Sequence, residues 1–251
     1  MKFLRRKQGK KTREPIPFKH VIPNMVTSGN LLCGMFSMIL AFNGRFVPAA
    51  WMVFFAVIFD GLDGKVARML GGGSHFGLEY DSLADAVSFG AAPAMLIYAA
   101  SLKGFGGIVG AMIACYFALC VALRLARFNV VHVPGPFQGL PSPAGGLFVS
   151  SFAMAGLPLE TIPGIMAVVM VATGFLMVSS VPYANLKKLT KASANRKKCF
   201  VVLGAVTLSF ILLHGAAPLV FFTVYIISGL VRFNWEEWLL LRTEEAAEKH
   251  S

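Results

Sequence analysis

Four aspartates in this sequence have a spacing that suggests a role in metal binding or catalysis. They lie in the stretch DGLDGKVARMLGGGSHFGLEYDSLAD, at Asp60, Asp63, Asp81 and Asp85. Carboxylate oxygens are hard ligands that suit Mg²⁺, Mn²⁺ or Ca²⁺. Two such ions about 3.5–4 Å apart are the usual arrangement for displacement at phosphorus. The stretch therefore predicts a site for divalent cations, with phosphoryl chemistry as the hypothesis.

The spacing predicts two carboxylate pairs on neighbouring helices. Asp60 and Asp63 are three residues apart, and Asp81 and Asp85 are four apart. Residues at these separations share a helical face, with Cβ atoms about 5–6 Å apart. The intervening GGGSHFG reverses the chain, so we expect a hairpin that presents the pairs to each other.

Three further residues of the stretch fit a phosphate-containing ligand. Gly64 and Gly77 leave the faces beside the carboxylates without side chains, so a bulky ligand can approach the backbone closely. Arg68 lies about one turn beyond Asp63, where its guanidinium can complement a phosphate or a carboxylate.

The composition predicts a protein that spans a membrane. Of its 251 residues 56% are hydrophobic and only 14% are charged, with a mean hydropathy of +0.68. A soluble domain of this size cannot bury so much apolar surface, so the surplus must face lipid. We expect an all-α, polytopic integral membrane protein. Ionised carboxylates inside it cost at least about 2.5–3.5 kcal/mol each, which bound cations would offset.

Eight stretches are apolar enough to be spanning helices, which need about 20 residues each. If Val47 begins the second helix, Asp60 lies about 20 Å along it, past the midplane toward the cytoplasmic interface. The stretches lie near residues 24–42, 47–70, 80–101, 106–128, 143–157, 162–182, 199–213 and 216–233. Because the fifth and seventh are short, six spans remain an alternative.

The basic residues predict the orientation. The net charge is +11, concentrated in MKFLRRKQGKKTREPIPFKH and NLKKLTKASANRKK. Lys and Arg accumulate on the cytoplasmic side, so we place both termini and the acidic loop there, in the inner membrane of a cell. Beside membrane helices such clusters indicate attraction to anionic headgroups rather than to nucleic acid. The expected division is a basic arm (1–20), a catalytic six-helix core (21–182), a basic loop (183–198), two further helices (199–233) and an interfacial turn with a polar tail (234–251).

The acidic stretch resembles the signature of a known enzyme family. Its fixed positions follow D-x2-D-G-x2-A-R-x8-G-x3-D-x3-D, from Asp60 to Asp85. This pattern resembles that of the CDP-alcohol phosphatidyltransferases. The stretches IPNMVTSGNLLCG, DSLADAVSFGAAPA, LRLARFNV and GLPSPAGG resemble the phosphatidylserine synthase branch of that family, and they extend the resemblance over residues 22–146.

The resemblance implies a reaction in which CDP-diacylglycerol donates its phosphatidyl group to L-serine, giving phosphatidylserine and CMP. It implies two divalent cations, Mg²⁺ or Mn²⁺, held by the four aspartates, with Asp85 also the base on the serine hydroxyl. A homodimer is a further expectation. The implied binding residues are Asn24, Thr27, Gly64, Ala67, Arg68 and Gly77 for CDP, and Arg124, Arg127, Asn129 and Ser142 for serine.

Several alternatives remain open. Asn24 and Thr27 are equally well explained as capping residues of the first helix. Arg124 and Arg127 also suit a helix C-terminus, where cations complement the dipole and extend to the interface; one of them would otherwise hold the serine carboxylate. Within the enzyme class the acceptor is alternatively glycerol 3-phosphate, or the donor an ether lipid.

A cation-coupled transporter is the alternative outside the enzymes. Acidic residues in membrane helices often mark ion pathways. Transporters of this kind usually carry inverted repeats or paired broken helices, and the sequence has no recognisable sign of either.

Overall fold

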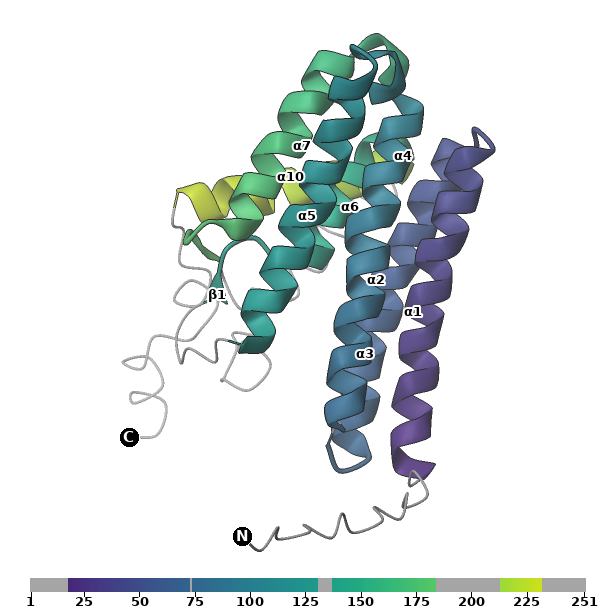
Figure 1. Cartoon of the computed structure of the whole chain (residues 1–251), viewed down its shortest axis with the longest axis vertical. Helices are drawn as coiled ribbons and strands as arrows, with labels where there is room; N and C mark the ends of the chain where they lie inside the picture. The colour runs from purple at the N-terminus through teal and green to yellow at the C-terminus, as the bar shows by residue number, and fades with distance from the viewer. Residues whose placement is uncertain (1–17, 73, 131–136, 184–212, 232–251) are drawn as a thin grey trace, which may run out of the picture.

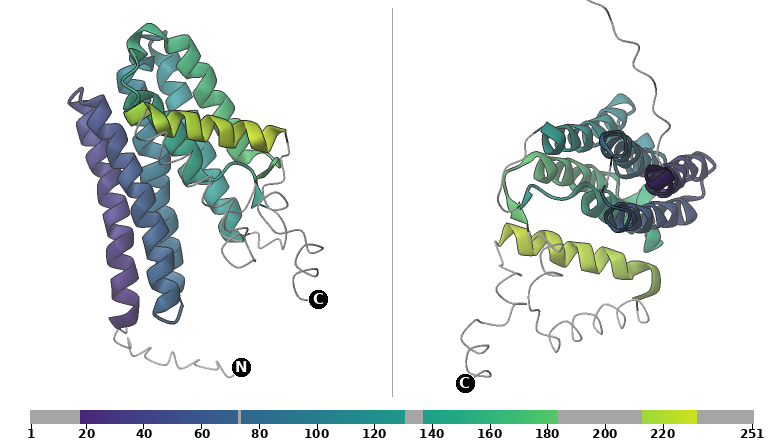
Figure 2. Two further views of the ribbon diagram at one scale, coloured as in Figure 1. Left: turned by 180° about the vertical axis from the view of Figure 1, so that it is seen from behind. Right: turned by 90° about the horizontal axis from the view of Figure 1, so that it is seen from below.

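The structure, a computed structural model, describes residues 18–72, 74–130, 137–183 and 213–231. These residues form a bundle of long, roughly parallel helices with one helix lying across it (Figures 1 and 2). The bundle consists of α1 (Phe18–Phe42), α2 (Phe46–Met69), α3 (His75–Asp85), α4 (Ala92–Ala100), α5 (Ile108–Val130), α6 (Ser142–Met154) and α7 (Pro163–Val178), and the crossing helix is α10 (Ala217–Leu230).

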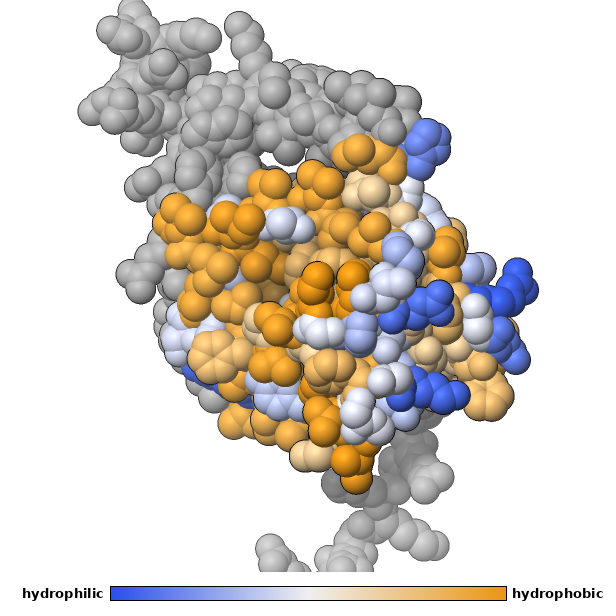
Figure 3. Space-filling model, turned by 90° about the horizontal axis from the view of Figure 1, so that it is seen from above, coloured by the Kyte–Doolittle hydropathy of each residue, from blue (hydrophilic) through white to orange (hydrophobic). Residues whose placement is uncertain are grey.

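Four helical segments are long and apolar enough to cross a membrane. They are Val21–Phe42, Phe46–Met69, His75–Ala100 and Ile108–Val130, and they match the first four predicted spans. Many large apolar side chains along these helices are exposed, as expected of a surface that faces lipid. The end of the bundle seen from above is apolar over much of its described area, with hydrophilic residues gathered on one side (Figure 3). The predicted spans 143–157 and 162–182 correspond to the shorter helices α6 and α7, which have 13 and 16 residues.

The expectation of eight spans is not confirmed. The predicted span 199–213 lies outside the described residues except for Leu213. The predicted span 216–233 corresponds to α10, which has 14 residues and crosses the bundle rather than running along it (Figure 2). A helix of this length extends about 21 Å, which is shorter than the roughly 30 Å hydrocarbon core of a bilayer.

Helix α1 holds α2 and α3 apart. It packs along both helices, whereas α2 and α3 make few direct contacts with each other. The chain reverses between α1 and α2 at Gly44, whose φ of +74° is a conformation that glycine adopts without strain. The result is a gap between the two helices that carry the aspartates, with α1 as its third wall.

A π-helical segment, η1 (Ala86–Ala91), follows directly after Asp85 and joins α3 to α4. Segments of this kind are rare and often occur at functional sites. Here η1 packs against α1, α5 and α6. Gly34 of α1 lies so close to it that an added Cβ would come within 2.8 Å of the Ser88 Cα atom. The backbone at the end of α3 is therefore fixed by tight helix packing.

A short ladder departs from the all-helical expectation. Strands β1 (Phe137–Gln138) and β2 (Pro182–Tyr183) pair antiparallel, with Phe137 opposite Tyr183. Leu140 N–H then donates to the Leu176 carbonyl near the end of α7. These bonds fix the entry into α6. Three short 3-10 turns make up the remaining regular structure of the described residues: η2 (Leu102–Gly104), η3 (Leu159–Thr161) and η4 (His214–Ala216).

The contact between Gly34 and Ser88 predicts a stability effect. In Gly34→Ala the added methyl group would push the backbones of α1 and η1 apart. Overpacking of this kind lowers the free energy of unfolding by about 1–3 kcal/mol. We expect a lower thermal unfolding midpoint in detergent. Gly61→Ala is the matched control, because a Cβ at that helical glycine meets no atom within 4 Å, so the better helix propensity of alanine should raise stability slightly. Equal midpoints for the two variants would contradict the prediction.

Candidate active site

Three of the four predicted aspartates converge in the gap between α2 and α3. Asp60, Asp63 and Asp81 each place one carboxylate oxygen so that the three atoms lie within 4.8 Å of one another. Asp63 is buried, and Asp60 and Asp81 are partly buried. Three hard oxygen ligands at this separation fit a divalent cation. The arrangement is therefore a candidate metal centre.

Asp85 lies deeper, at the end of α3. Its exposed fraction is 7%, and the charges of Asp60, Asp81 and Asp63 all act on it. Its Oδ1 atom accepts a 2.9 Å hydrogen bond from the Asn30 side-chain amide. Asn30 is fully buried, and its backbone carbonyl accepts from the Ser88 hydroxyl of η1 at 2.9 Å. A buried carboxylate held at one oxygen in this way has a fixed orientation.

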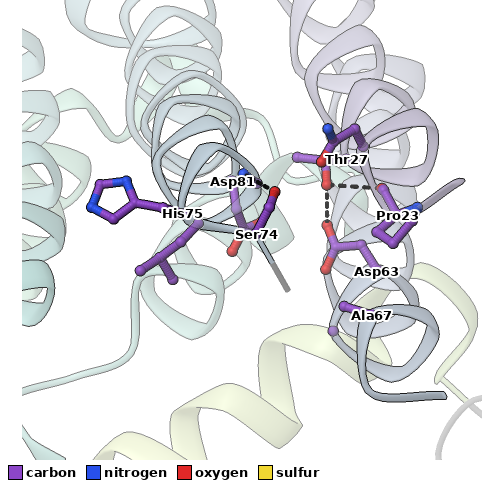
Figure 4. A pocket seen from close by; sticks show the side chains of 11 residues that line it. Pro23, Thr27, Asp63, Ala67, Ser74, His75 and Asp81 are labelled. Atoms are coloured by element: carbon purple, nitrogen blue, oxygen red, sulfur yellow. Dashed lines mark hydrogen bonds between the residues drawn. The ribbon is translucent and has the colours of Figure 1, made fainter. Parts of the chain in front are cut away.

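Helix α1 supports one carboxylate on each side of the gap. Besides the bond from Asn30 to Asp85, the Thr27 hydroxyl lies 2.9 Å from Asp63 Oδ2 and 3.1 Å from the Pro23 carbonyl. A hydroxyl has one proton, so these two acceptors share it. Thr27 and Asn30 are three residues apart and therefore face the same way. Figure 4 shows Thr27 beside Asp63, with Asp81 on the opposite wall.

A pocket of about 480 Å³ opens beside the carboxylates. It contains five of the six residues predicted for CDP, and Arg68 is exposed at the end of α2 and is not among them. A Cβ on Gly64 would meet no atom within 4 Å, whereas one on Gly77 would approach Asn24 Oδ1 to 3.0 Å. The lining residues are Pro23, Asn24, Thr27, Asp63, Gly64, Ala67, Ser74, His75, Gly77, Leu78 and Asp81.

The residues predicted for the acceptor divide into two groups. Arg124 donates through Nη1 to the buried Ser142 hydroxyl at 2.8 Å, and the charges of Asp85 and Asp60 act on it. Arg127 is exposed and lies 3.4 Å from the Val178 carbonyl at the end of α7. The Asn129 amide donates to Ser82 of α3 at 2.9 Å. Arg124, which is bonded to Ser142, thus lies within reach of the carboxylate charges, whereas Arg127 and Asn129 contact neighbouring helices.

Sequence reasoning missed Asn30 and Ser74. Asn30 lies within IPNMVTSGNLLCG, which we used only for its family resemblance, and its spacing from Thr27 was the signal that links both to the site. Ser74 accepts from Gly77 N–H at 2.9 Å and caps α3. Ser, Thr and Asp are the preferred residues at this position, so the sequence itself carried that signal. The cap fixes where α3 begins and hence where Asp81 faces.

These features define a class of protein: a helical membrane protein with a carboxylate centre beside a pocket between its helices. The sequence profile of the CDP-alcohol phosphatidyltransferase family matches residues 20–184. That segment contains the carboxylate centre, the pocket, Arg124 and Ser142. The chain belongs to this family.

Relatives of the chain extend the match over most of its length. It is 36% identical to a CDP-diacylglycerol–serine O-phosphatidyltransferase of Helicobacter pylori, over 90% of this chain and 94% of the relative. It is 35% identical to a protein of the same name from Methanocaldococcus jannaschii, over 84% and 94%. An archaetidylserine synthase of Methanothermobacter thermautotrophicus is 38% identical over 69% of this chain and 73% of the relative.

A comparison with solved structures finds a phosphatidylinositol phosphate synthase of Mycobacterium tuberculosis with CDP-DAG bound. The TM-score is 0.46 at 24% identity, covering 62% of this chain and 80% of that chain. The same synthase in complex with manganese and citrate has a TM-score of 0.47 at 23% identity, covering 63% of this chain and 78% of that chain.

The bond from Thr27 to Asp63 predicts an effect on metal binding. Thr27→Val keeps the shape of the side chain and removes the hydroxyl that donates to Asp63. Loss of a hydrogen bond to a metal ligand typically lowers the affinity for the metal about 10–100-fold. We expect a fall of that size in Mn²⁺ affinity, measured by calorimetry on purified protein. Thr27→Ser keeps the hydroxyl and should bind Mn²⁺ as the unaltered protein does. Full affinity in Thr27→Val would show that Asp63 needs no support from α1.

Proposed function

We propose that this protein transfers the phosphatidyl group of CDP-diacylglycerol to L-serine, giving phosphatidylserine and CMP. The observation that carries the proposal is the convergence of Asp60, Asp63 and Asp81, with Asp85 beside them, in the gap between α2 and α3. Relatives that match nearly the full chain are named for this reaction, which supports serine over glycerol 3-phosphate as the acceptor.

The carboxylate set fits two divalent cations, Mg²⁺ or Mn²⁺. Asp60, Asp63 and Asp81 would hold one ion, and Asp85 would contribute to a second. Bound ions would neutralise the diphosphate of the donor and the charge that develops on departing CMP. The pocket beside them is lined by Asn24, Thr27, Gly64, Ala67 and Gly77 and would take the CDP moiety, with Arg68 near its margin.

Asp85 is the proposed base. The serine hydroxyl is a weak nucleophile, and a positioned carboxylate that accepts its proton typically contributes 10²–10⁴-fold. Because Asn30 occupies Oδ1, Oδ2 is the atom that takes the proton. The serine oxygen then forms a bond to the phosphorus that carries the diacylglycerol. The bond from that phosphorus to the CMP oxygen breaks, and CMP leaves.

Arg124 is the proposed partner of the serine carboxylate. Its Nη1 is engaged by Ser142, and its Nε is buried with no hydrogen-bond partner among the described residues. A carboxylate binds two neighbouring N–H groups of a guanidinium, so the Nε edge suits this acceptor. The nearby charge of Asp85 supports a position of the amino acid between Arg124 and the proposed base. Arg127 and Asn129, which were also predicted for serine, are bonded to neighbouring helices, so no direct contact with serine is proposed for them.

Other parts of the expectation stay predictions. They are the inner-membrane location with both termini and the site facing the cytoplasm, the homodimer, and the division into five segments. The similarity to an archaetidylserine synthase keeps an ether-lipid donor as a second candidate with the same acceptor chemistry.

CMP release by the purified protein in detergent tests the proposal. We expect release from CDP-diacylglycerol only when L-serine and Mg²⁺ or Mn²⁺ are both present, and none after chelation with EDTA. Release with glycerol 3-phosphate in place of serine would reassign the acceptor. Metal binding without any CMP release would favour the transporter.

Asp85→Asn should reduce turnover about 10²–10⁴-fold, because the amide cannot accept the hydroxyl proton. Asn30→Leu removes the donor that orients Asp85 but leaves the carboxylate, so a smaller loss of kcat is expected, about 10–100-fold. Both are read from initial rates of CMP release at saturating serine. If Asp85→Asn kept most of the turnover, another group would be the base.

Arg124→Lys should raise the KM for serine about 10–100-fold, because a lysine keeps the charge and loses the two-pronged geometry. Arg127→Lys is the matched control, since the structure directs that side chain to the backbone of α7, and its KM should stay within about three-fold. Steady-state CMP release over a serine titration gives both values. A larger effect at Arg127 would exchange the two roles.

A further inference from the structure

Three consecutive residues of α3 have three different partners. The Tyr80 hydroxyl lies 2.9 Å from the Ser28 hydroxyl of α1. Asp81 belongs to the carboxylate cluster. Ser82 accepts a 2.9 Å hydrogen bond from the Asn129 side-chain amide near the end of α5. Successive residues of an α-helix are about 100° apart around its axis, so Tyr80 and Ser82 anchor nearly opposite sides of α3.

The bond between Ser82 and Asn129 joins two helices that otherwise touch little. Helices α3 and α5 make few direct contacts with each other, and α5 leans away from α3 toward its C-terminal end (Figure 1). Both side chains are partly buried. The Leu78 carbonyl, one turn earlier in α3, lies 3.2 Å from the Ser82 hydroxyl and can take its proton. Ser82 can therefore accept the bond from α5.

The bond between Tyr80 and Ser28 restrains the other side of α3. The Ser28 hydroxyl donates to the Asn24 carbonyl at 2.8 Å, so its oxygen can accept from Tyr80. The Phe76 ring stacks on Tyr80 with the two centroids 5.9 Å apart. Ser28 directly follows Thr27, whose hydroxyl reaches the opposite wall of the gap. One short stretch of α1 thus contacts both walls of the candidate metal centre.

The rotation of α3 about its axis decides where the carboxylate of Asp81 lies. Asp81 is one turn before Asp85, where the tight packing of η1 fixes the backbone. Side-chain atoms lie about 5–6 Å from a helix axis, so a rotation of about 10° moves a carboxylate by about 1 Å. Distances from oxygen ligands to a cation must stay within about 0.2 Å of their usual values. A ligand on α3 therefore requires restraint against rotation.

We propose that Asn129 is a positioning residue for the metal centre. Through Ser82 it holds α3 at the rotation that turns Asp81 toward the carboxylates of α2, and the bond between Tyr80 and α1 completes the restraint. This inference rests on the divalent cations of the proposed function and deepens it. A residue that the family resemblance assigned to serine acts instead on the metal site, because its amide nitrogen is engaged by α3.

Mn²⁺ affinity, measured by calorimetry on purified protein, tests the inference. Asn129→Leu keeps the approximate size of the side chain and removes the amide. We expect an affinity about 3–10-fold lower, a smaller effect than the 10–100-fold typical of a residue bonded directly to a metal ligand. Asn43→Leu is the matched control, because Asn43 is exposed and donates to the Ile39 carbonyl at the far end of α1. Its Mn²⁺ affinity should equal that of the unaltered protein.

Variants of the bonded partners separate the bond from the fold. Ser82→Ala should lower the Mn²⁺ affinity as Asn129→Leu does, and the double variant should fall no further, because each single change already removes the same bond. Ser82→Thr keeps the hydroxyl and should restore the affinity. Tyr80→Phe removes the restraint on the α1 side, so its combination with Asn129→Leu should bind Mn²⁺ more weakly than either single variant.

The serine KM separates this role from direct binding of the acceptor. At saturating Mn²⁺ the serine KM of Asn129→Leu should stay within about two-fold of the unaltered value. A raised serine KM with unchanged Mn²⁺ affinity would assign Asn129 to serine and overturn the inference. A lower thermal unfolding midpoint with unchanged Mn²⁺ affinity would overturn it too, because the bond would then only stabilise the fold.

Calorimetry needs no turnover, so the two proposals can fail separately. If the unaltered protein binds Mn²⁺ but releases no CMP, the proposed function is overturned, and the affinities of the variants still decide the role of Asn129. An unaltered protein that binds no Mn²⁺ overturns both.

Discussion

Repulsion among carboxylates in the gap between α2 and α3 is the constraint on which the rest of the structure depends. Two unit charges 4.8 Å apart repel by about 3.5 kcal/mol at an effective dielectric constant near 20. Three such pairs amount to about 10 kcal/mol, before Asp85 is included. The hydrogen bonds from Thr27 and Asn30 contribute about 1.5–3 kcal/mol each. They orient the carboxylates but are too weak to offset repulsion of this size, which a bound divalent cation would relieve.

The same constraint explains how the helices are arranged. If α2 and α3 packed directly against each other, the carboxylates would be forced together without room for a cation. Helix α1 contacts both and keeps them apart, and its polar residues Thr27 and Asn30 face the gap. Its small residue Gly34 lets it approach η1 closely. One face of α1 therefore supplies donors at the site, and the same helix provides tight packing beyond it.

The sequence was sufficient for the features that depend on local spacing. Periodicity placed Asp60 with Asp63 and Asp81 with Asp85, and hydropathy located the four long spans to within a few residues, except that α1 starts earlier and the third span begins at His75. The contributions of α1 were harder to predict, because the bond from Asn30 to Asp85 joins residues 55 positions apart. No local pattern specifies such a pairing. The π-helical η1 likewise depends on packing against α1, α5 and α6 rather than on its own residues.

Distant packing also gives Arg124 and Arg127 different surroundings, which the sequence could not predict. The two residues are three apart on α5, and both suit the end of a helix. They differ in that Arg124 lies beside the start of α6. The β1–β2 ladder and the bond from Leu140 N–H to the Leu176 carbonyl hold the start of α6 in this position. The direction of α10 is a similar case, because an apolar stretch has the same hydropathy whether it spans a bilayer or lies across other helices.

The site consequently has two halves with different structural origins. The pocket and the three clustered carboxylates come from α1, α2 and α3, and all lie within the family-matched segment. The surroundings of Arg124 combine α5 with the start of α6, and α10, which lies outside that segment, packs on α6. A donor that is common to a family requires the first half to stay constant, whereas acceptors differ in charge and shape. If Arg124 binds the acceptor as proposed, its surroundings can change without disturbing the helices that hold the carboxylates.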